Sequence, residues 1–180
     1  MKEEYTRDEE QEKSLEEQLE KSPHARKAMG YFRDGYNCSQ SIVLAFSEEM
    51  GLDEKSLLRL SSSFGGGMGR LREVCGSVSG MFMVTGYLFG YDDPKDYETK
   101  KELYGRIQEL AGKFTHINGS IVCRDLLGLS KGPDEPVPEK RTEAYYSKRP
   151  CPKIIGISAM ILEEYLQEHR EETEGLVSDF

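Results

Sequence analysis

Four cysteines are the residues of this 180-residue chain best suited to redox or metal chemistry: Cys38, Cys75, Cys123 and Cys151. Successive cysteines lie 37, 48 and 28 positions apart, so the chain has neither a C-x-x-C redox motif nor the paired C-x-x-C knuckles of a zinc ribbon. A zinc ribbon is therefore excluded. The four thiols can form one redox or metal centre only if the fold brings them together.

The composition favours a protein of a reducing compartment. The net charge is −9, and the first 20 residues contain no apolar run that could act as a secretory signal. We therefore expect a cytoplasmic location, where cysteines are more often catalytic, redox-sensing, metal-bound or simply buried than tied in permanent disulfides. No stretch concentrates lysine and arginine, so nucleic acid is not expected as a partner.

Three of the cysteines are predicted to lie at helix N-termini. A capping-box pattern that begins at Asn37 places Cys38 first in its helix, and Cys123 falls in the first turn of a short one. Cys151 occupies the cap position before Pro152. Because a helix N-terminus lowers the pKa of a thiol, we predict that Cys38 is more acidic than a free thiol. Nearby cations favour thiolates as well: Arg70, Arg72, Arg124, Lys148, Arg149 and Lys153.

The fourth cysteine opens the segment Cys75-Gly76-Ser77-Val78-Ser79-Gly80. Glycines four apart share one face of a helix, so Gly76 and Gly80 offer bare backbone to another cysteine, a cofactor or a neighbouring helix. Gly86 and Gly90 have the same spacing, and we expect close approach there too. The preceding glycines fit no phosphate-loop pattern, although an anion-binding nest of backbone amides is compatible with them.

Hydrophobic spacing and capping residues indicate an all-α fold, a single-domain bundle of about six or seven helices around the glycine-rich one. No alternation typical of strands persists, and residues 129–142 form a loop of a length that is often functional. Residues 64–69 hold too many glycines to be helical. Helices are predicted over residues 23–34, 38–50, 54–60, 73–91, 94–118, 121–127 and 152–165.

The chain divides into three parts. Residues 1–21 form a charged arm that is either a weakly held helix or disordered, residues 22–172 the four-cysteine helical domain, and residues 173–180 a tail. Residues 74–91 are uncharged and long enough to span a membrane, but their glycine and hydroxyl content favours a buried central helix. We therefore expect no membrane span.

The three histidines are isolated in sequence and lack metal-ligand spacing, so surface or capping roles are expected for His24 and His169. His116 lies in a turn shortly before Cys123. It is a candidate proton acceptor for a thiol. No serine hydrolase motif is present.

At these residues the sequence resembles the C_GCAxxG_C_C family of redox-active bacterial and archaeal proteins, which is named for four cysteines, one of them in a C-G-A-x-x-G motif. The resemblance covers about residues 25–165, and the family's alanine is Ser77 here, which keeps the small size and adds a hydroxyl. The matching segments are Tyr36-Asn37-Cys38-Ser39-Gln40, Phe64-Gly65-Gly66-Gly67-Met68-Gly69, the Cys75 motif, Cys123-Arg124-Asp125-Leu126-Leu127-Gly128 and Arg149-Pro150-Cys151-Pro152.

The resemblance implies electron transfer or thiol redox chemistry, since some relatives are described as selenoproteins and a related domain occurs in a haem cytochrome. It names no substrate. We therefore predict a four-cysteine centre at Cys38, Cys75, Cys123 and Cys151 that exchanges electrons or disulfides with a redox partner protein or a small molecule, which would make the protein a thiol-dependent oxidoreductase.

Two alternatives stay open. The same four thiolates could bind a metal ion or an iron–sulfur cluster as cofactor, or the protein could be a non-catalytic helical scaffold whose cysteines fill the core. Both functional readings require the four sulfurs to lie around one cavity beside the Gly76/Gly80 face, and core filling does not. The pairing of the cysteines is open because four cysteines permit three connectivities.

Overall fold

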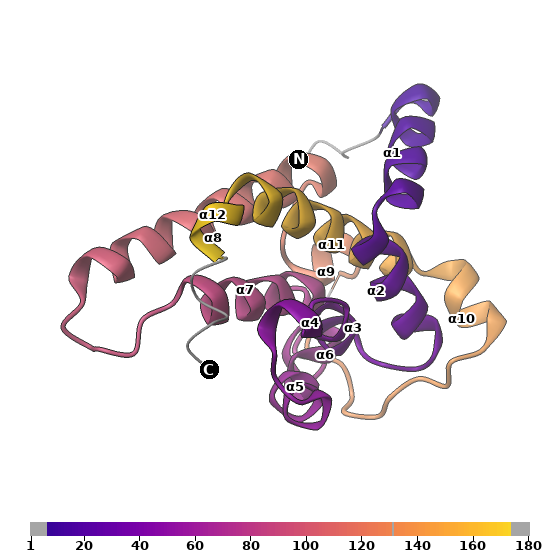
Figure 1. The fold of residues 1–180 in the computed structure, drawn as a ribbon. Helices are drawn as coiled ribbons and strands as arrows, with labels where there is room; N and C mark the ends of the chain where they lie inside the picture. Colours follow the sequence, from indigo (N-terminus) through magenta and orange to yellow (C-terminus); the bar gives the residue numbers. More distant parts are fainter. Residues whose placement is uncertain (1–6, 131, 174–180) are drawn as a thin grey trace.

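The computed structural model describes residues 7–130 and 132–173, and these residues form an all-α fold without strands, as predicted (Figure 1). Among them, seven helices have eight or more residues: six correspond to predicted helices and the seventh is α1, whereas the helix predicted over residues 121–127 is only four residues long. They are α1 (Glu9–Lys21), α2 (Pro23–Arg33), α3 (Cys38–Ala45), α5 (Glu54–Ser61), α7 (Gly76–Phe89), α8 (Tyr97–Asn118) and α11 (Cys151–Glu168). Shorter helices lie between or after them: α4 (Ser47–Met50), η1 (Ser62–Phe64), α6 (Gly65–Met68), α9 (Cys123–Leu126), α10 (Glu143–Lys148) and α12 (Arg170–Thr173).

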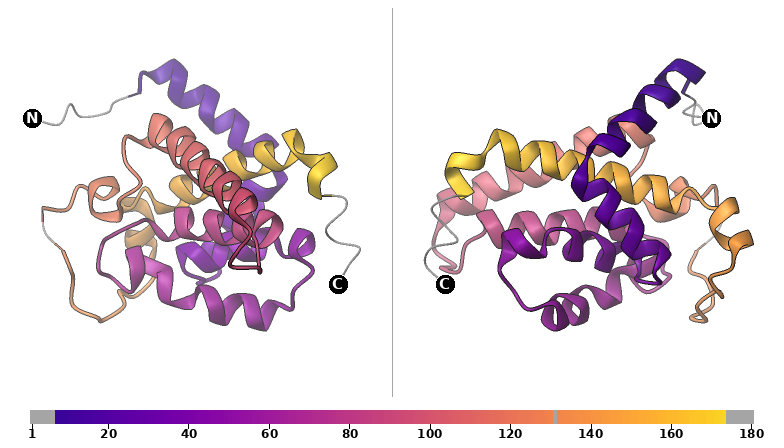
Figure 2. Two further views of the ribbon diagram at one scale, coloured as in Figure 1. Left: turned by 90° about the vertical axis from the view of Figure 1, so that its left-hand side faces the viewer. Right: turned by 45° about the vertical axis from the view of Figure 1, so that its right-hand side comes forward.

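The uncharged helix α7 is the centre of the fold. It packs against α3 on one side and against α8 and α11 on others, which explains why it tolerates no charged residue (Figure 2). Its side chains at Val78, Met81 and Val84 are fully buried. No helix of the described residues is long and apolar enough to cross a membrane.

Close approach at glycine occurs where α7 meets α3. A Cβ atom at Gly80 would lie 2.9 Å from Ile42 Cβ, and one at Gly76 would lie 3.1 Å from Cys38 Cβ. The expected close approach at Gly86 is wrong, because no heavy atom outside its own helix lies within 4 Å of that position. Gly76 and Gly80 share the face that α3 covers, whereas Gly86, six positions after Gly80, lies on another side of the helix.

The N-terminal segment forms a helix where it is described. Asp8 caps α1 in a capping box, and Leu15 and Leu19 are buried against the body of the molecule although the helix projects from it (Figures 1 and 2). Lys153 of α11 pairs with Glu12 of α1. Residues 1–6 and 174–180, which include most of the predicted tail, lie outside the described residues.

Three of the differences from the predicted helix boundaries have an identifiable structural feature. The helix predicted to run to Met50 is interrupted at Phe46, and the longest helix is capped by Asp96 rather than by Asp93 and Pro94. The helix predicted from residue 73 begins at Gly76, because Val74 forms an antiparallel bridge with Val122. That bridge joins segments almost 50 residues apart, which no local pattern reveals.

Candidate functional site

All four cysteines lie at the starts of helices and line one cavity of about 290 Å³. Cys38, Cys123 and Cys151 are the first residues of α3, α9 and α11, and Cys75 is the N-cap of α7. Cys75 and Cys123 are buried, Cys38 and Cys151 are partly exposed, and all four are free thiols. The prediction that the cysteines converge on one cavity is therefore confirmed, with Gly76 but not Gly80 in its wall.

The capping box at Asn37 fixes the start of α3 as the sequence predicts. The Asn37 side chain accepts hydrogen bonds from the backbone amides of Ser39 and Gln40, and the Gln40 side chain accepts one from the Asn37 amide. Cys38 is held between these residues. Its Cβ packs against Gly76, so α3 and α7 present their first residues to the same space.

The bridge between Val74 and Val122 brings the next two cysteines together. The amide of Cys75 donates to the carbonyl of Ile121 at 2.8 Å, and the amide of Cys123 donates to the carbonyl of Glu73 at 2.7 Å. Gly67 of the glycine-rich turn closes over Cys123, since a Cβ there would lie 2.6 Å from Cys123 Cβ. The turn was predicted to be irregular, and Gly66 and Gly67 indeed have positive φ within it.

The thiols of Cys38 and Cys151 interact with each other, and each has the other as the first cause of its pKa shift. Cys38 donates a hydrogen bond to the Cys151 sulfur, and this bond, together with the charges of Arg149, Arg72 and Arg141, outweighs burial and lowers the Cys151 pKa to about 7. Cys151 is therefore a much better source of thiolate near neutral pH than an ordinary cysteine. Cys151 is the first residue of its helix, with Pro150 as the cap, one position later in the helix than predicted.

The prediction that Cys38 is unusually acidic is wrong. Its hydrogen bond to Cys151 and its burial raise the Cys38 pKa well above the ordinary value, despite its place at a helix N-terminus. Burial raises the Cys75 pKa to about 11 and also raises that of Cys123, although Arg72 acts against it. Desolvation and neighbouring thiols outweigh the helix end in these three cases.

The four thiols are electrostatically one group. Ionisation of Cys151 disfavours ionisation of each of the other three, and the same repulsion links Cys38, Cys75 and Cys123 with one another. The first of the four thiols to ionise is thus Cys151, and its charge opposes ionisation of the others.

Ser77 uses its hydroxyl to contact the motif cysteine, Cys75. Its Oγ lies 3.3 Å from the Cys75 sulfur and accepts a hydrogen bond of 2.9 Å from Ser158 of α11. Ser77 is fully buried, so it keeps the close packing of a small residue. Its bond to Cys75 opposes the effect of burial on the Cys75 pKa.

Arginines surround the cavity more fully than sequence proximity predicts. Arg72 is buried, lies 3.7 Å from the Cys123 sulfur and pairs with Asp134. Arg141 lies ten residues before Cys151, outside the immediate neighbourhood of any cysteine, and it also lines the cavity. The only indication of this role in the sequence is that Arg141 belongs to the long loop, residues 129–142, that was expected to be functional. Two of the expected cations act elsewhere: Arg124 pairs with Glu73, and Lys153 with Glu12 and Glu16.

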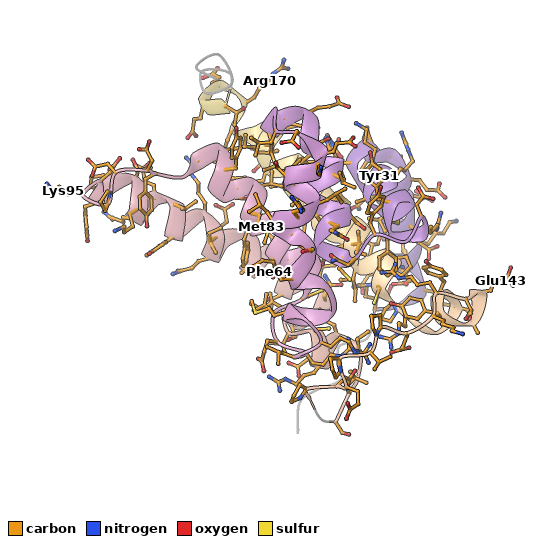
Figure 3. The ribbon with its side chains drawn as sticks, turned by 90° about the horizontal axis from the view of Figure 1, so that it is seen from below. Tyr31, Phe64, Met83, Lys95, Glu143 and Arg170 are labelled. Carbon is orange, nitrogen blue, oxygen red and sulfur yellow. The ribbon has the colours of Figure 1, made fainter. Side chains whose placement is uncertain are left out.

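The loop after α9 returns to cover the cavity. Figure 3, which views the molecule from below, shows the chain that follows Phe64 and the segment that leads to Glu143 meeting beneath the helices. Tyr145 packs against Phe32 in the cavity wall, and the Arg149 guanidinium lies 4.9 Å from the Tyr145 ring centroid.

The histidines are outside this cavity. His116 is exposed and does not line it, so the structure does not place it as a proton acceptor for Cys123. His24 pairs with Glu49 and Glu163, and His169 stacks on Tyr165. Within residues 7–130 and 132–173, no three histidine, cysteine or acidic side chains are grouped in a way that could hold a metal ion.

The fold and the site define an all-α protein with a four-thiol cavity at converging helix N-termini. The family model described as "Putative redox-active protein (C_GCAxxG_C_C)" matches residues 36–165, well over half of the chain. The protein belongs to this family. Comparison with curated proteins and with solved structures finds no match.

Proposed function

We propose that this protein is a thiol redox protein in which Cys151 attacks a disulfide and Cys38 resolves the product. The observation that carries the proposal is that Cys38 and Cys151 line one cavity as the first residues of α3 and α11. The two thiols interact, and this interaction lowers the Cys151 pKa to about 7. A thiolate near its pKa at ambient pH combines availability with nucleophilicity. The redox description of the family supports the same chemistry.

Cys75 and Cys123 take a different part in this proposal. Both are buried and have raised pKa values, so they are protonated at neutral pH and are poor attacking groups. They line the same cavity as the exchange pair, and we assign them to a later electron or disulfide transfer after Cys38 and Cys151 have been oxidised. The reducing cytoplasm, expected from the sequence, would return the pair to its dithiol form.

Redox titration tests the proposal. Reduced protein would be equilibrated without oxygen in thiol–disulfide buffers of graded potential, acid-quenched, alkylated and mapped by peptide mass spectrometry. The first two thiols lost are expected to be those of Cys38 and Cys151, recovered as one disulfide that joins their two peptides. The Cys75→Ser variant should retain this step, whereas the Cys38→Ser variant should accumulate a mixed disulfide on Cys151.

The same preparation separates the alternatives. A first disulfide between another pair, or dithiols that stay reduced across the whole range of potentials, would contradict the proposed exchange pair. Stoichiometric iron or zinc in anaerobically purified protein, lost on substitution of a single cysteine, would instead favour the metal-binding reading. If the folded protein forms no disulfide and binds no metal, the non-catalytic scaffold is favoured.

A further inference from the structure

The wall of the thiol cavity is positively charged in a protein whose net charge is −9. Four guanidinium groups line it, and among the lining residues Glu139 is the one carboxylate; Asp134 reaches two of the arginines from outside the lining. The lining arginines are Arg70, Arg72, Arg141 and Arg149. Positive charge is therefore concentrated beside the thiols.

Three of these arginines are engaged by carboxylates. Arg72 pairs with Asp134, Arg149 pairs with Glu139, and Arg70 lies between the two acids, 3.2 Å from Asp134 and 3.6 Å from Glu139. Two carboxylates thus pair with three guanidinium groups. The net charge of these five side chains is positive even without Arg141.

Arg141 is held in place by groups that leave its charge intact. It donates a hydrogen bond of 2.9 Å to the Phe32 carbonyl, and its guanidinium lies 4.3 Å from the Phe32 ring centroid and 5.6 Å from that of Tyr145. Within the part of the chain that the structure describes, no carboxylate pairs with Arg141. Aromatic faces orient a guanidinium without neutralising it.

These charges do more than stabilise the Cys151 thiolate. A single thiolate needs one compensating charge, but Arg149, Arg72 and Arg141 all act on Cys151. An anionic group of a bound molecule would find the remaining positive charge at the same cavity as the attacking sulfur. The volume of about 290 Å³ is near the lower end for ligand pockets and suits a small molecule rather than a folded partner.

We propose that the cavity selects a small disulfide that carries carboxylates, with Arg141 and Arg149 binding a carboxylate while Cys151 attacks the adjacent sulfur. This inference rests on the proposed exchange function and names its substrate class. The Cys151 thiolate forms a mixed disulfide and releases one half of the substrate as thiolate. Cys38 then loses its proton and attacks the Cys151 sulfur, and the second half leaves as a thiol that carries that proton. The protein dithiol is oxidised, and the substrate disulfide is reduced by two electrons.

Three small disulfides of similar length and different charge provide the test: 3,3′-dithiodipropionate, bis(2-hydroxyethyl) disulfide and cystamine, which are anionic, neutral and cationic. Reduced full-length protein would be mixed with each disulfide. Rapid alkylation and mass spectrometry would then measure how fast the Cys38 and Cys151 thiols disappear. Rates would be divided by those of 2-mercaptoethanol with the same disulfides, so that intrinsic reactivity cancels. We expect the anionic disulfide to be favoured over the neutral one by about tenfold, and less so in high salt.

Arginine variants locate the effect. Arg141→Gln is expected to remove most of the preference for the anionic disulfide, and Arg149→Gln provides a second variant if the first folds poorly. Rates would be compared on the high-pH plateau, where the Cys151 thiolate is fully formed in every protein. Arg124→Gln is the matched control, because Arg124 pairs with Glu73 and does not line the cavity.

The two levels of the proposal fail in different ways. If the neutral disulfide oxidises the pair and the anionic one shows no normalised advantage, the substrate class is wrong and the exchange function stands. If none of the three disulfides oxidises Cys38 and Cys151 in folded protein, the exchange function fails and the substrate class fails with it.

Discussion

Cys38 and Cys151 are each the first residue of a helix, yet their pKa values move in opposite directions. The helix N-terminus is common to both and therefore cannot cause the difference. The difference comes from tertiary contacts: Arg149, Arg72 and Arg141 act on Cys151, whereas the thiol of the partly exposed Cys38 is desolvated and donates to the Cys151 sulfur. The proton of the pair consequently resides on Cys38 and the negative charge on Cys151.

The first prediction concerns this hydrogen bond. In Cys38→Ala the donor to Cys151 is lost, so the Cys151 pKa should rise from about 7 toward the ~8.5 of a free thiol, and alkylation of Cys151 at pH 7 should slow by up to about tenfold. Cys38→Ser keeps a hydroxyl donor and should show a smaller rise. The measurement is the pH dependence of alkylation at Cys151, read by peptide mass spectrometry. An unchanged midpoint in Cys38→Ala would show that the arginines alone set the Cys151 pKa.

At the same scale, the sequence identifies the reacting atoms but not their surroundings. The four cysteines could be selected from residue type and resemblance, and the Asn37 cap from a local pattern of four residues. Arg141 and Ser158 could not, because they reach the site through contacts with Phe32 and Ser77, far away in the chain. Those contacts decide which thiol ionises and what charge a substrate meets.

Among the helices, the interface of α3 and α7 sets the geometry of the site. The spacing of Gly76 and Gly80 correctly predicts close packing, and the same spacing of Gly86 and Gly90 predicts it wrongly at Gly86. Helical periodicity reports which residues share a face. Gly86 is six positions after Gly80, which turns it about 240° around the helix and away from the face that α3 covers.

Alanine substitutions at two glycines of α7 should therefore have opposite effects. Gly80→Ala would place a methyl group 2.9 Å from both Ile42 Cβ and the Ser39 carbonyl oxygen, and separating the helices should lower the free energy of unfolding by about 1–3 kcal/mol. In Gly86→Ala, the added methyl group has no neighbouring atom within 4 Å, so the higher helix propensity of alanine should raise the free energy of unfolding by up to about 1 kcal/mol. Urea unfolding of the reduced proteins measures both. Equal tolerance of the two variants would contradict the close contact of α3 with α7.

For the whole molecule, a second charged cluster ties the helices together at a distance from the thiols. His24 of α2 lies 2.6 Å from Glu49 of α4 and 3.0 Å from Glu163 of α11, and its ring stacks on Phe46 with 4.2 Å between centroids. Glu163 is twelve residues along α11 from Cys151, about 18 Å at the helical rise. The cluster thus joins α2, α4 and α11 on a part of the molecule that the thiol cavity does not reach.

This cluster should make stability depend on pH. Burial alone would lower the His24 pKa, but hydrogen bonds and charge from Glu49 and Glu163 outweigh it and raise the pKa above 6.5. A raised folded pKa contributes stability that is complete below about pH 6.5 and is lost as pH rises through the folded value. The pKa of Glu49 is lowered, so its own contribution is present above about pH 4.5 and disappears only at lower pH.

His24→Gln should consequently destabilise the reduced protein more at pH 5.5 than at pH 8.5, with a difference of up to about 1 kcal/mol in the free energy of unfolding. Comparing variant with wild type at each pH cancels the thiol titrations, which the two proteins share. Glu49→Gln removes one of the two carboxylates. In that background, the His24→Gln effect should differ less between pH 5.5 and pH 8.5. If His24→Gln costs equal stability at both pH values, the imidazole acts only through its stacking on Phe46, and the ion pairs among α2, α4 and α11 contribute nothing measurable.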